Sequence, residues 1–331
     1  MPDQVSESPS KDEPWVVLGS SGFVGQGITK VLRQRGIETT EMSAPRLEAD
    51  PSMGADDLIL LAERSDVLDE LVSQFRGAKV VINAAGMATP DGNDSRALYG
   101  ANALLPALVA MAAVHAGVER VILLSSAAVQ GNRLVLDESV ETEPFSPYSR
   151  SKALGESATL AFAKTIPEAG ILIIRATSVQ GIHRSTTRSL RRIARTPLAS
   201  VASPGTQQSV VSSLEGLSTF VADMAVITSL KTPAILIQPW EGANVADVLS
   251  LAGGKPPIIL PAWLCRTVVS AGKFVGRKIP RIAGITRRIE VMWFGQRQVE
   301  GLAVNGRYIT NATGDAGVTA YLSRTLSGGE S

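Results

Sequence analysis

A short stretch near the N-terminus, residues 15–25, constrains the fold more than any other part of the sequence. It reads WVVLGSSGFVG, so an apolar run is followed by glycines at 19, 22 and 25, and apolar residues at helical spacing come next. A strand, a glycine-rich turn and a helix in this order are typical of a dinucleotide-binding motif. The glycines allow a tight turn, close approach of backbone N–H groups to a pyrophosphate and close helix packing. Because glycine turns without a ligand are common, this stretch alone leaves both interpretations open.

Composition indicates a globular chain with a substantial core. Of its 331 residues, 44% are apolar and 19% are charged, and a net charge of +1 excludes nucleic acid as the main partner. The single cysteine, Cys265, excludes an internal disulfide framework and predicts a cytoplasmic protein. Residues 1–13 are polar and are expected to form a disordered tail. We expect no uncharged apolar run of the roughly 18–20 residues that span a bilayer.

The end of the second expected strand, 37–42, bears on the choice of cofactor. Many NAD-binding proteins place an acidic residue here, where it holds the ribose hydroxyls. This chain has Ser43 instead, and Arg46 follows three residues later. Since a cation suits a 2′-phosphate, NADP(H) is favoured over NAD(H), although Arg46 also fits a solvated loop.

Two further strand ends and one helix carry small or polar residues at candidate ligand positions. Ala84, Ala85 and Gly86 follow the apolar run 79–83 and leave room for a ligand. Asn102 lies in an otherwise apolar helix, 97–116, and needs a hydrogen-bonding partner if it is buried. The run 121–124 ends in Ser125 and Ser126, and hydroxyls at such a position point into the ligand crevice of a parallel sheet.

A tyrosine and a lysine stand four residues apart at the start of the next helix. Helical spacing places Tyr148 and Lys152 on one face, where the ammonium stabilises the phenolate form of the tyrosine. Tyr148 is then able to exchange a proton with a carbonyl or hydroxyl group near neutral pH, and Ser126 to polarise the same oxygen. A surface Tyr–Lys pair at this spacing is the alternative.

Together these residues resemble the extended short-chain dehydrogenase/reductase superfamily, in its NAD-dependent epimerase/dehydratase branch. The resemblance rests on the order and spacing of the elements over residues 15–181 and thins out beyond Gly181. It is carried by the glycine turn, the Asn83–Gly86 segment, Asn102, Ser125-Ser126, Tyr148-x-x-x-Lys152, and Arg175 before Val179-x-Gly181.

The resemblance implies an α/β Rossmann fold, a doubly wound parallel sheet of about seven strands with a smaller C-terminal substrate lobe. We expect residues 14–181, completed by about 209–240, to form the NAD(P)-binding domain. Residues 182–208 and 241–331 are expected to form the substrate-binding lobe.

The resemblance also implies an NAD(P)-dependent oxidoreductase, a ketoreductase or epimerase acting on a nucleotide-sugar-like substrate. Tyr148 is the expected acid/base, assisted by Lys152 and Ser126, and no metal site is expected. The expected cofactor contacts are Gly19, Ser21, Gly22, Phe23, Val24, Gly25, Ser43, Arg46, Ala84, Ala85, Gly86, Asn102, Tyr148, Lys152, Ala176 and Ser178.

Departures from the family pattern narrow the activity. Ala127 and Ala128 stand where family dehydratases place an Asp-Glu pair, which disfavours dehydration. Gln130 and Gln180 replace tyrosines of the two V-Y-G motifs. Gln208 replaces an arginine that often binds the diphosphate of the substrate in this family. The usual mode of diphosphate binding is therefore in doubt for this chain.

Two other functions stay open. One is a non-catalytic dinucleotide-binding protein of the same fold, although such proteins usually lose the tyrosine or the lysine. The other is a membrane-surface dehydrogenase of a lipidic alcohol, suggested by the basic, apolar stretch 263–281 and less favoured than a substrate-lobe helix. A homodimer is expected, because the alanine-rich stretch 107–116 suits close helix packing.

Overall fold

The chain divides into two compact units. The computed structural model describes residues 14–88, 93–227, 232, 234–301 and 319–328. The first unit comprises residues 1–129, 139–176 and 218–237, and the second comprises 130–138, 177–217 and 238–331. Residues 130–138 thus group with the second unit, although they lie within the expected nucleotide-binding segment, because their strand pairs with a strand near residue 297. The expected tail, 1–13, lies outside the described residues.

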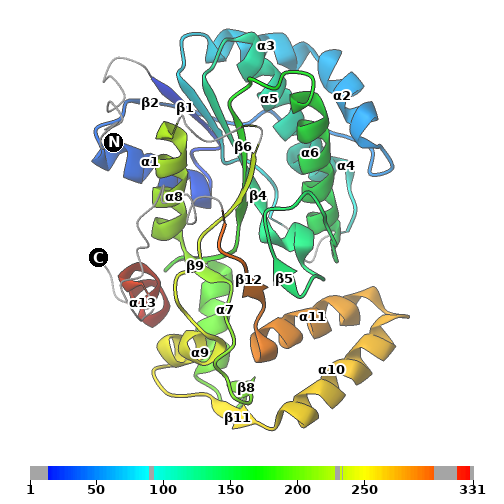
Figure 1. The fold of residues 1–331 in the computed structure, drawn as a ribbon, viewed down its shortest axis with the longest axis vertical. Coiled ribbons are helices and arrows are strands. Elements are labelled where there is room, and N and C mark those ends of the chain that lie inside the picture. Colours follow the sequence, from blue (N-terminus) through cyan, green and yellow to red (C-terminus); the bar gives the residue numbers. More distant parts are fainter. Residues whose placement is uncertain (1–13, 89–92, 228–231, 233, 302–318, 329–331) are drawn as a thin grey trace, which may run out of the picture. The chain divides into compact units, whose positions relative to one another are not determined.

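Six parallel strands form the central sheet of the first unit, in the order β10-β6-β4-β3-β1-β2 (Figure 1). Apolar runs make up most of these strands, and their residues are buried because helices cover both faces. The strands are β1 (Trp15–Leu18), β2 (Thr39–Met42), β3 (Val80–Asn83), β4 (Arg120–Ser126), β6 (Ile171–Ala176) and β10 (Ala234–Ile237).

This sheet confirms the expected Rossmann architecture, with six strands among the described residues rather than about seven. The chain runs from β1 outwards to β2 and then returns to β3 on the other side of β1. The point at which the strand order reverses is where such sheets bind ligands. The other described strands pair in twos instead of extending the sheet: β5 (Val135–Leu136) with β12 (Arg297–Gln298), β7 (Ser178–Gln180) with β9 (Val211–Ser213), and β8 (Ser200–Ala202) with β11 (Ile258–Leu260).

Helices cover the two faces of the sheet. On one face, α1 (Phe23–Gln34) lies beside α8 (Leu214–Val226), and Arg35 at the end of α1 pairs with Asp223 of α8 at 2.7 Å (Figure 1). On the other face, α2 (Ala55–Glu63), α3 (Asp66–Phe75), α5 (Leu105–His115) and α6 (Pro147–Ala163) pack together. The expected single helix 58–75 is therefore two helices, since α2 ends at Glu63 and α3 begins at Asp66, where Asp66 and Asp69 in the first turn complement the helix dipole.

A continuous helical run crosses this second layer. It comprises α4 (Arg96–Tyr99), a π-helical turn η1 (Gly100–Leu104) and α5. By length and composition this run is able to span a membrane, contrary to our expectation, and 83% of its apolar window is buried inside the fold. Ala107, Ala110 and Ala113 are fully buried against neighbouring helices of the same chain. Most of the alanine-rich stretch is thus core of the first unit, and the expected homodimer stays a prediction.

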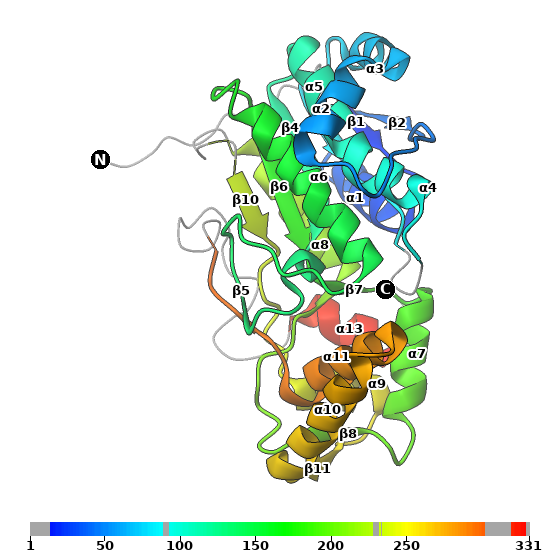
Figure 2. The same cartoon turned by 90° about the vertical axis from the view of Figure 1, so that its right-hand side faces the viewer.

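The second unit is built from small helices and short strand pairs. A small apolar core joins α7 (Ser185–Ala194), α9 (Val245–Gly253) and α13 (Ala320–Ser327) through residues such as Leu190, Val248 and Leu322. A hairpin of α10 (Ala262–Gly276) and α11 (Pro280–Phe294) follows β11 (Figure 2). Gly272 and Gly276 of α10 allow the close approach, since a Cβ on them would lie 2.4 Å from Thr286 and 2.9 Å from Ala283.

Candidate functional site

The glycine turn after β1 is held by close backbone packing. Gly19 has a φ of +79°, and a Cβ at this position would lie 2.7 Å from the backbone of Ala85. Gly25 lies in the first turn of α1, where a Cβ would approach the Gly19 carbonyl oxygen to 2.1 Å. These two positions therefore accept only glycine without a backbone shift. The turn keeps the start of α1 close to the ends of β1 and β3.

The N-terminus of α1 suits an anion. Gly22 is its N-cap residue and provides no capping side chain, and the first turn contains no acidic residue. The N-terminal amide groups and the helix dipole favour negative charge at this end. Among the residues expected to contact the pyrophosphate, Ser21 and Gly22 are exposed and Phe23 and Val24 are half-buried. This cradle fits the pyrophosphate of a dinucleotide.

The end of β3 lies beside the end of β1, at the reversal of strand order. Leu18 and Asn83 are paired residues of these two strands, and the Ala84 amide donates to the Leu18 carbonyl at 2.9 Å. Gly86 is exposed with a φ of +156°, and a Cβ there would lie 2.8 Å from Asn102 Oδ1 and 3.0 Å from Lys152 Nζ. The expected cofactor residues Ala84–Gly86, Asn102 and Lys152 thus lie together.

Asn102 lies in the π-helical turn η1 and is fully buried. Its Oδ1 accepts from the Met87 amide, and its Nδ2 donates to the Met87 carbonyl, each at 3.0 Å, and to Ser151 Oγ at 3.1 Å. Gly155 of α6 lets the two helices approach, because a Cβ there would lie 2.3 Å from the Asn102 carbonyl oxygen. Asn102 thereby ties the loop after β3 to α6.

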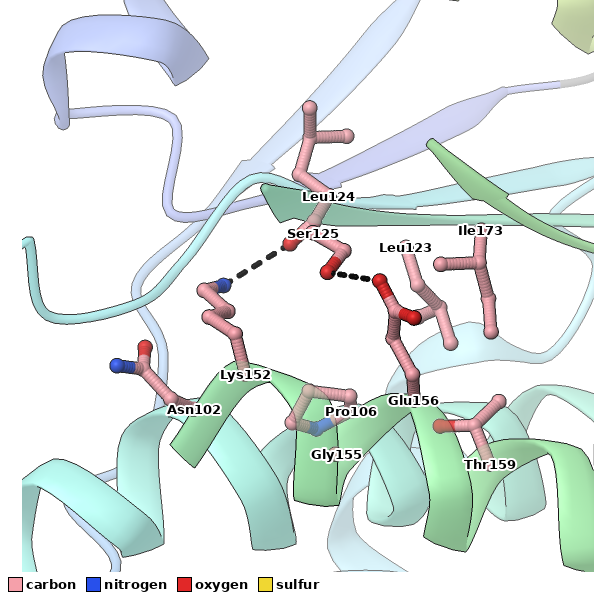
Figure 3. Close-up of a pocket in the computed structure, with 10 residues that line it drawn as sticks. All are labelled: Asn102, Pro106, Leu123, Leu124, Ser125, Lys152, Gly155, Glu156, Thr159 and Ile173. Atoms are coloured by element: carbon pink, nitrogen blue, oxygen red, sulfur yellow. Dashed lines mark hydrogen bonds between the residues drawn. The ribbon is translucent and has the colours of Figure 1, made fainter. Parts of the chain in front are cut away.

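Lys152 reaches from α6 to the end of β4. Its buried Nζ donates to the Leu124 carbonyl at 2.9 Å (Figure 3). Burial lowers the pKa of this ammonium to about 8, and the nearby Glu156 carboxylate opposes the shift. The small cavity behind it, about 10 Å³, has room for roughly one water molecule and none for a nicotinamide ring.

A buried ionic network lies next to Lys152, and the sequence analysis missed its central residue, Glu156. Ser125 Oγ donates to Glu156 Oε1 at 2.5 Å (Figure 3), and Arg175 Nη2 donates to Glu156 Oε2 at 2.7 Å. Arg175 Nη1 also donates to the Ser139 carbonyl at 2.8 Å. Two sequence signals point to this network: an arginine inside the apolar strand ILIIRA, and a glutamate one helical turn after Lys152.

The two serines at the end of β4 therefore have different roles. Ser125 donates a hydrogen bond to Glu156 within the ionic network. Ser126 is half-buried, and its Oγ accepts from the Ala128 amide at 3.2 Å. The hydroxyl proton of Ser126 is left available for another acceptor. Tyr148 is the second residue of α6 and is half-buried, one turn before Lys152, and its carbonyl accepts from Ser151 Oγ.

The remaining expected contacts are dispersed. Ser43 and Arg46 are exposed in the loop after β2, and Arg46 has no ion pair with any described residue. Ala176 ends β6 and is paired with Ser126 of β4. Ser178 is exposed on β7 of the second unit.

The three glutamines that replace family motif residues make local bonds within the second unit. Gln130 exchanges two hydrogen bonds with Asp137, at 2.8 and 3.0 Å. Gln180 accepts from the Thr187 hydroxyl at 2.8 Å, and Gln208 Oε1 accepts from the Gln298 amide at 2.8 Å. No group of three or more potential metal-ligating side chains occurs in the part of the chain that the structure describes.

Several solved structures share this fold. MoeE5 in complex with UDP-glucose and NAD matches with a TM-score of 0.56 at 19% identity, over 95% of this chain and 98% of that one. UDP-glucuronic acid 4-epimerase from Bacillus cereus in complex with NAD matches with a TM-score of 0.54 at 18% identity, over 75% and 85%. A dTDP-4-dehydrorhamnose reductase from Bacillus anthracis in complex with NADP matches with a TM-score of 0.52 at 17% identity, over 75% and 83%.

The neighbours thus bind NAD or NADP, and they include proteins named for nucleotide-sugar substrates. None of the curated protein sequences matches this chain significantly. The family profile described as "NAD dependent epimerase/dehydratase family" matches residues 15–221, well over half of the sequence. This match covers the glycine turn, Asn102, Ser126, Tyr148 and Lys152. The chain belongs to the NAD-dependent epimerase/dehydratase family.

Proposed function

We propose that the protein is an NAD(P)-dependent ketoreductase or epimerase acting on a carbonyl or hydroxyl group of a nucleotide-sugar-like substrate. The observation that carries the proposal is the arrangement around Lys152, which the Leu124 carbonyl and the buried network hold one turn after Tyr148. Burial disfavours the charged form of Lys152 and therefore costs stability. A non-catalytic protein of the same fold would gain nothing from this cost, so the buried lysine supports a catalytic role.

Each residue has a defined part in the proposed reaction. The bound nicotinamide supplies or accepts the hydride at the substrate carbon. Tyr148 gives its phenolic proton to the developing alkoxide during reduction and takes the proton back from the alcohol during oxidation. Lys152 stabilises the phenolate that Tyr148 becomes, and Ser126 donates its hydroxyl proton to the same substrate oxygen.

The cofactor would lie across the reversal of strand order. Its pyrophosphate would meet the start of α1 at Gly22 and Phe23, and its ribose hydroxyls would meet Lys152, beside the loop that Asn102 ties to α6. The exposed Arg46 guanidinium, which has no ion pair with any described residue, supports a preference for the 2′-phosphate of NADP(H). Nucleotide-sugar substrates are proposed because the structural neighbours MoeE5 and UDP-glucuronic acid 4-epimerase are described with them.

Tyr148→Phe tests the mechanism, since it removes one oxygen atom. We expect turnover of UDP- and dTDP-hexoses or their keto forms to fall by roughly 10²- to 10⁴-fold. NADPH and NADH binding, followed by fluorescence titration, should stay within about threefold of the parent protein, because binding does not use the phenol proton. The same titrations test whether NADPH binds more tightly than NADH.

Tyr321→Phe is the matched control, because it removes the same atom from α13. Undiminished turnover in Tyr148→Phe would refute the mechanism. Cofactor binding without hydride exchange on any substrate, in the parent protein, would instead support a non-catalytic dinucleotide-binding function.

A further inference from the structure

One side of α10 exposes large apolar side chains. Trp263 is 69% exposed and Phe274 is 70% exposed, and Leu264, Val268 and Val275 are also exposed. We call these five residues the α10 face. Ile258 and Ile259 on β11, which leads into α10 (Figure 2), are more than half exposed as well. Exposed aromatic residues in such number mark an interaction surface.

The residues of α10, with its C-cap residue Arg277, form three separate stripes. Small and apolar residues, Cys265, Val269 and Gly276, are buried on the side that packs against α11. The α10 face occupies much of the exposed side. Arg266, Lys273 and Arg277, spaced seven and four residues apart, line one margin of this face. A helix that carries an exposed apolar stripe beside a cationic stripe is typical of helices that lie in a lipid–water interface.

The charge of the hairpin is predominantly positive. From residue 248 to residue 289 the sequence contains no aspartate or glutamate and eight cations: Lys255, Arg266, Lys273, Arg277, Lys278, Arg281, Arg287 and Arg288. Glu290 pairs with Lys273 at 2.7 Å and with Arg287 at 2.8 Å. Arg266 and Arg277 are exposed and form no ion pair with any described residue. The margin of the α10 face thus complements an anionic surface.

A recess at the same margin adds room for a headgroup. It measures about 340 Å³ and lies wholly within the second unit. Lys273, Arg277 and Arg287 line it, together with Glu290 as the single acidic residue and Asn132 among the neutral ones. The excess of cations favours an anionic group of phosphate size in this recess.

We propose that the α10 face docks on a membrane surface rich in anionic phospholipids, with its apolar residues among the acyl chains and Arg266 and Arg277 at the headgroup phosphates. A second copy of the chain fits less well, because apposition of two such faces brings their cationic margins together. The proposal concerns the second unit alone and does not depend on the proposed reaction.

Vesicle flotation tests the proposal with the full-length protein. We expect it to float with phosphatidylcholine vesicles that contain about one-third phosphatidylglycerol, and to stay in solution with pure phosphatidylcholine. Arg266→Gln with Arg277→Gln should weaken binding about 30-fold, roughly fivefold per cation, and added salt should weaken the parent protein's binding likewise. Trp263→Ala with Phe274→Ala should weaken binding at least about tenfold.

Matched control variants distinguish binding through the α10 face from a general effect of surface charge or hydrophobicity. Lys30→Gln with Arg64→Gln removes two exposed cations from the first unit, and Leu60→Ala trims an apolar side chain there that is 48% exposed. These controls should bind vesicles like the parent protein, and circular dichroism should show every variant folded. The proposal fails if the parent protein does not float, if the α10 variants float as well as the controls, or if Trp263→Ala with Phe274→Ala only dissociates a dimer.

Discussion

In the first unit the charged side chains next to Lys152 lie inside the fold with fixed partners, whereas Arg266 and Arg277 in the second unit are exposed to solvent. Arg175 and Glu156 are 0% and 4% exposed and bind each other directly. Arg266 and Arg277 are exposed beside an apolar face and pair with no described residue. A buried ion needs exact hydrogen-bond geometry, so the first unit is built to hold groups in place. The exposed Arg266 and Arg277 of the second unit are instead placed to bind a partner outside the chain.

Two helical glycines, one in each unit, differ in how closely they are packed. Gly25 in α1 is enclosed, and a Cβ there would collide with the Gly19 carbonyl, whereas a Cβ on Gly284 in α11 would meet no atom within 4 Å. The glycine of the first unit is therefore required by backbone packing around the cradle. The contrast yields three predictions of decreasing size.

The largest effect is expected from Glu156→Gln. It leaves the Arg175 charge buried and unpaired, and should lower the free energy of unfolding by about 3–5 kcal/mol. Urea denaturation measures this loss. Glu215→Gln is the control in the second unit, because its pair with Arg324 is about half exposed and should contribute less than about 1 kcal/mol.

Replacing both partners, Glu156→Leu with Arg175→Met, should recover most of the stability, since no uncompensated charge remains. Equal losses from Glu156→Gln and Glu215→Gln would show that the two units do not differ in this way.

Lys152 should make stability depend on pH above about 8. The pKa of Lys152 is about 8 in the folded protein, and its ordinary value is 10.5. Below pH 8 the lysine is therefore protonated in both the folded and the unfolded protein, and the folded protein bears the full free-energy cost of burying its charge. Between about pH 8 and 10.5 the unfolded chain binds more protons, and stability rises with pH. Lys152→Met should therefore be more stable than the parent by about 2–3 kcal/mol at pH 7, and the gain should vanish near pH 10.5.

Urea denaturation of both proteins from pH 7 to 10 measures this difference, and the groups common to both cancel. If the free energy of unfolding changed with pH in the same way in both proteins, burial of the Lys152 charge would not cost the expected stability.

The smallest effect is expected from two glycine substitutions with opposite signs. Gly25→Ala should destabilise the protein by about 1–3 kcal/mol, because the backbone of the turn must move, and it should weaken NAD(P)H binding. Gly284→Ala should stabilise by about 0.5–1 kcal/mol, because alanine favours the helix and finds open space. Thermal unfolding with and without NADPH measures both, and destabilisation by Gly284→Ala would contradict the contrast.

Most of the first unit was predictable from local pattern. Buried parallel strands are continuous apolar runs, and the glycine turn is a local motif. The family resemblance that these elements carry over residues 15–181 then implied the Rossmann architecture. Helix boundaries were less predictable: the apolar spacing runs on through the break between α2 and α3, and the π-helical turn at Asn102 has no periodic signal. The role of Ser125 was missed because its partner Glu156, and the Arg175 that binds Glu156, lie 31 and 50 residues further along the chain.

The sequence by itself determined the family and the order of its motifs, because spacing along a strand, turn or helix is a local property. Tertiary structure alone decided that residues 107–113 are buried in the core, since burial depends on distant helices. It also decided that Gly155 brings Lys152 beside Asn102, and that Cys265 and Gly276 face α11 while Trp263 and Phe274 face solvent. Which polar groups are enclosed and which apolar ones are exposed depends on contacts between distant segments, and local pattern does not specify those contacts.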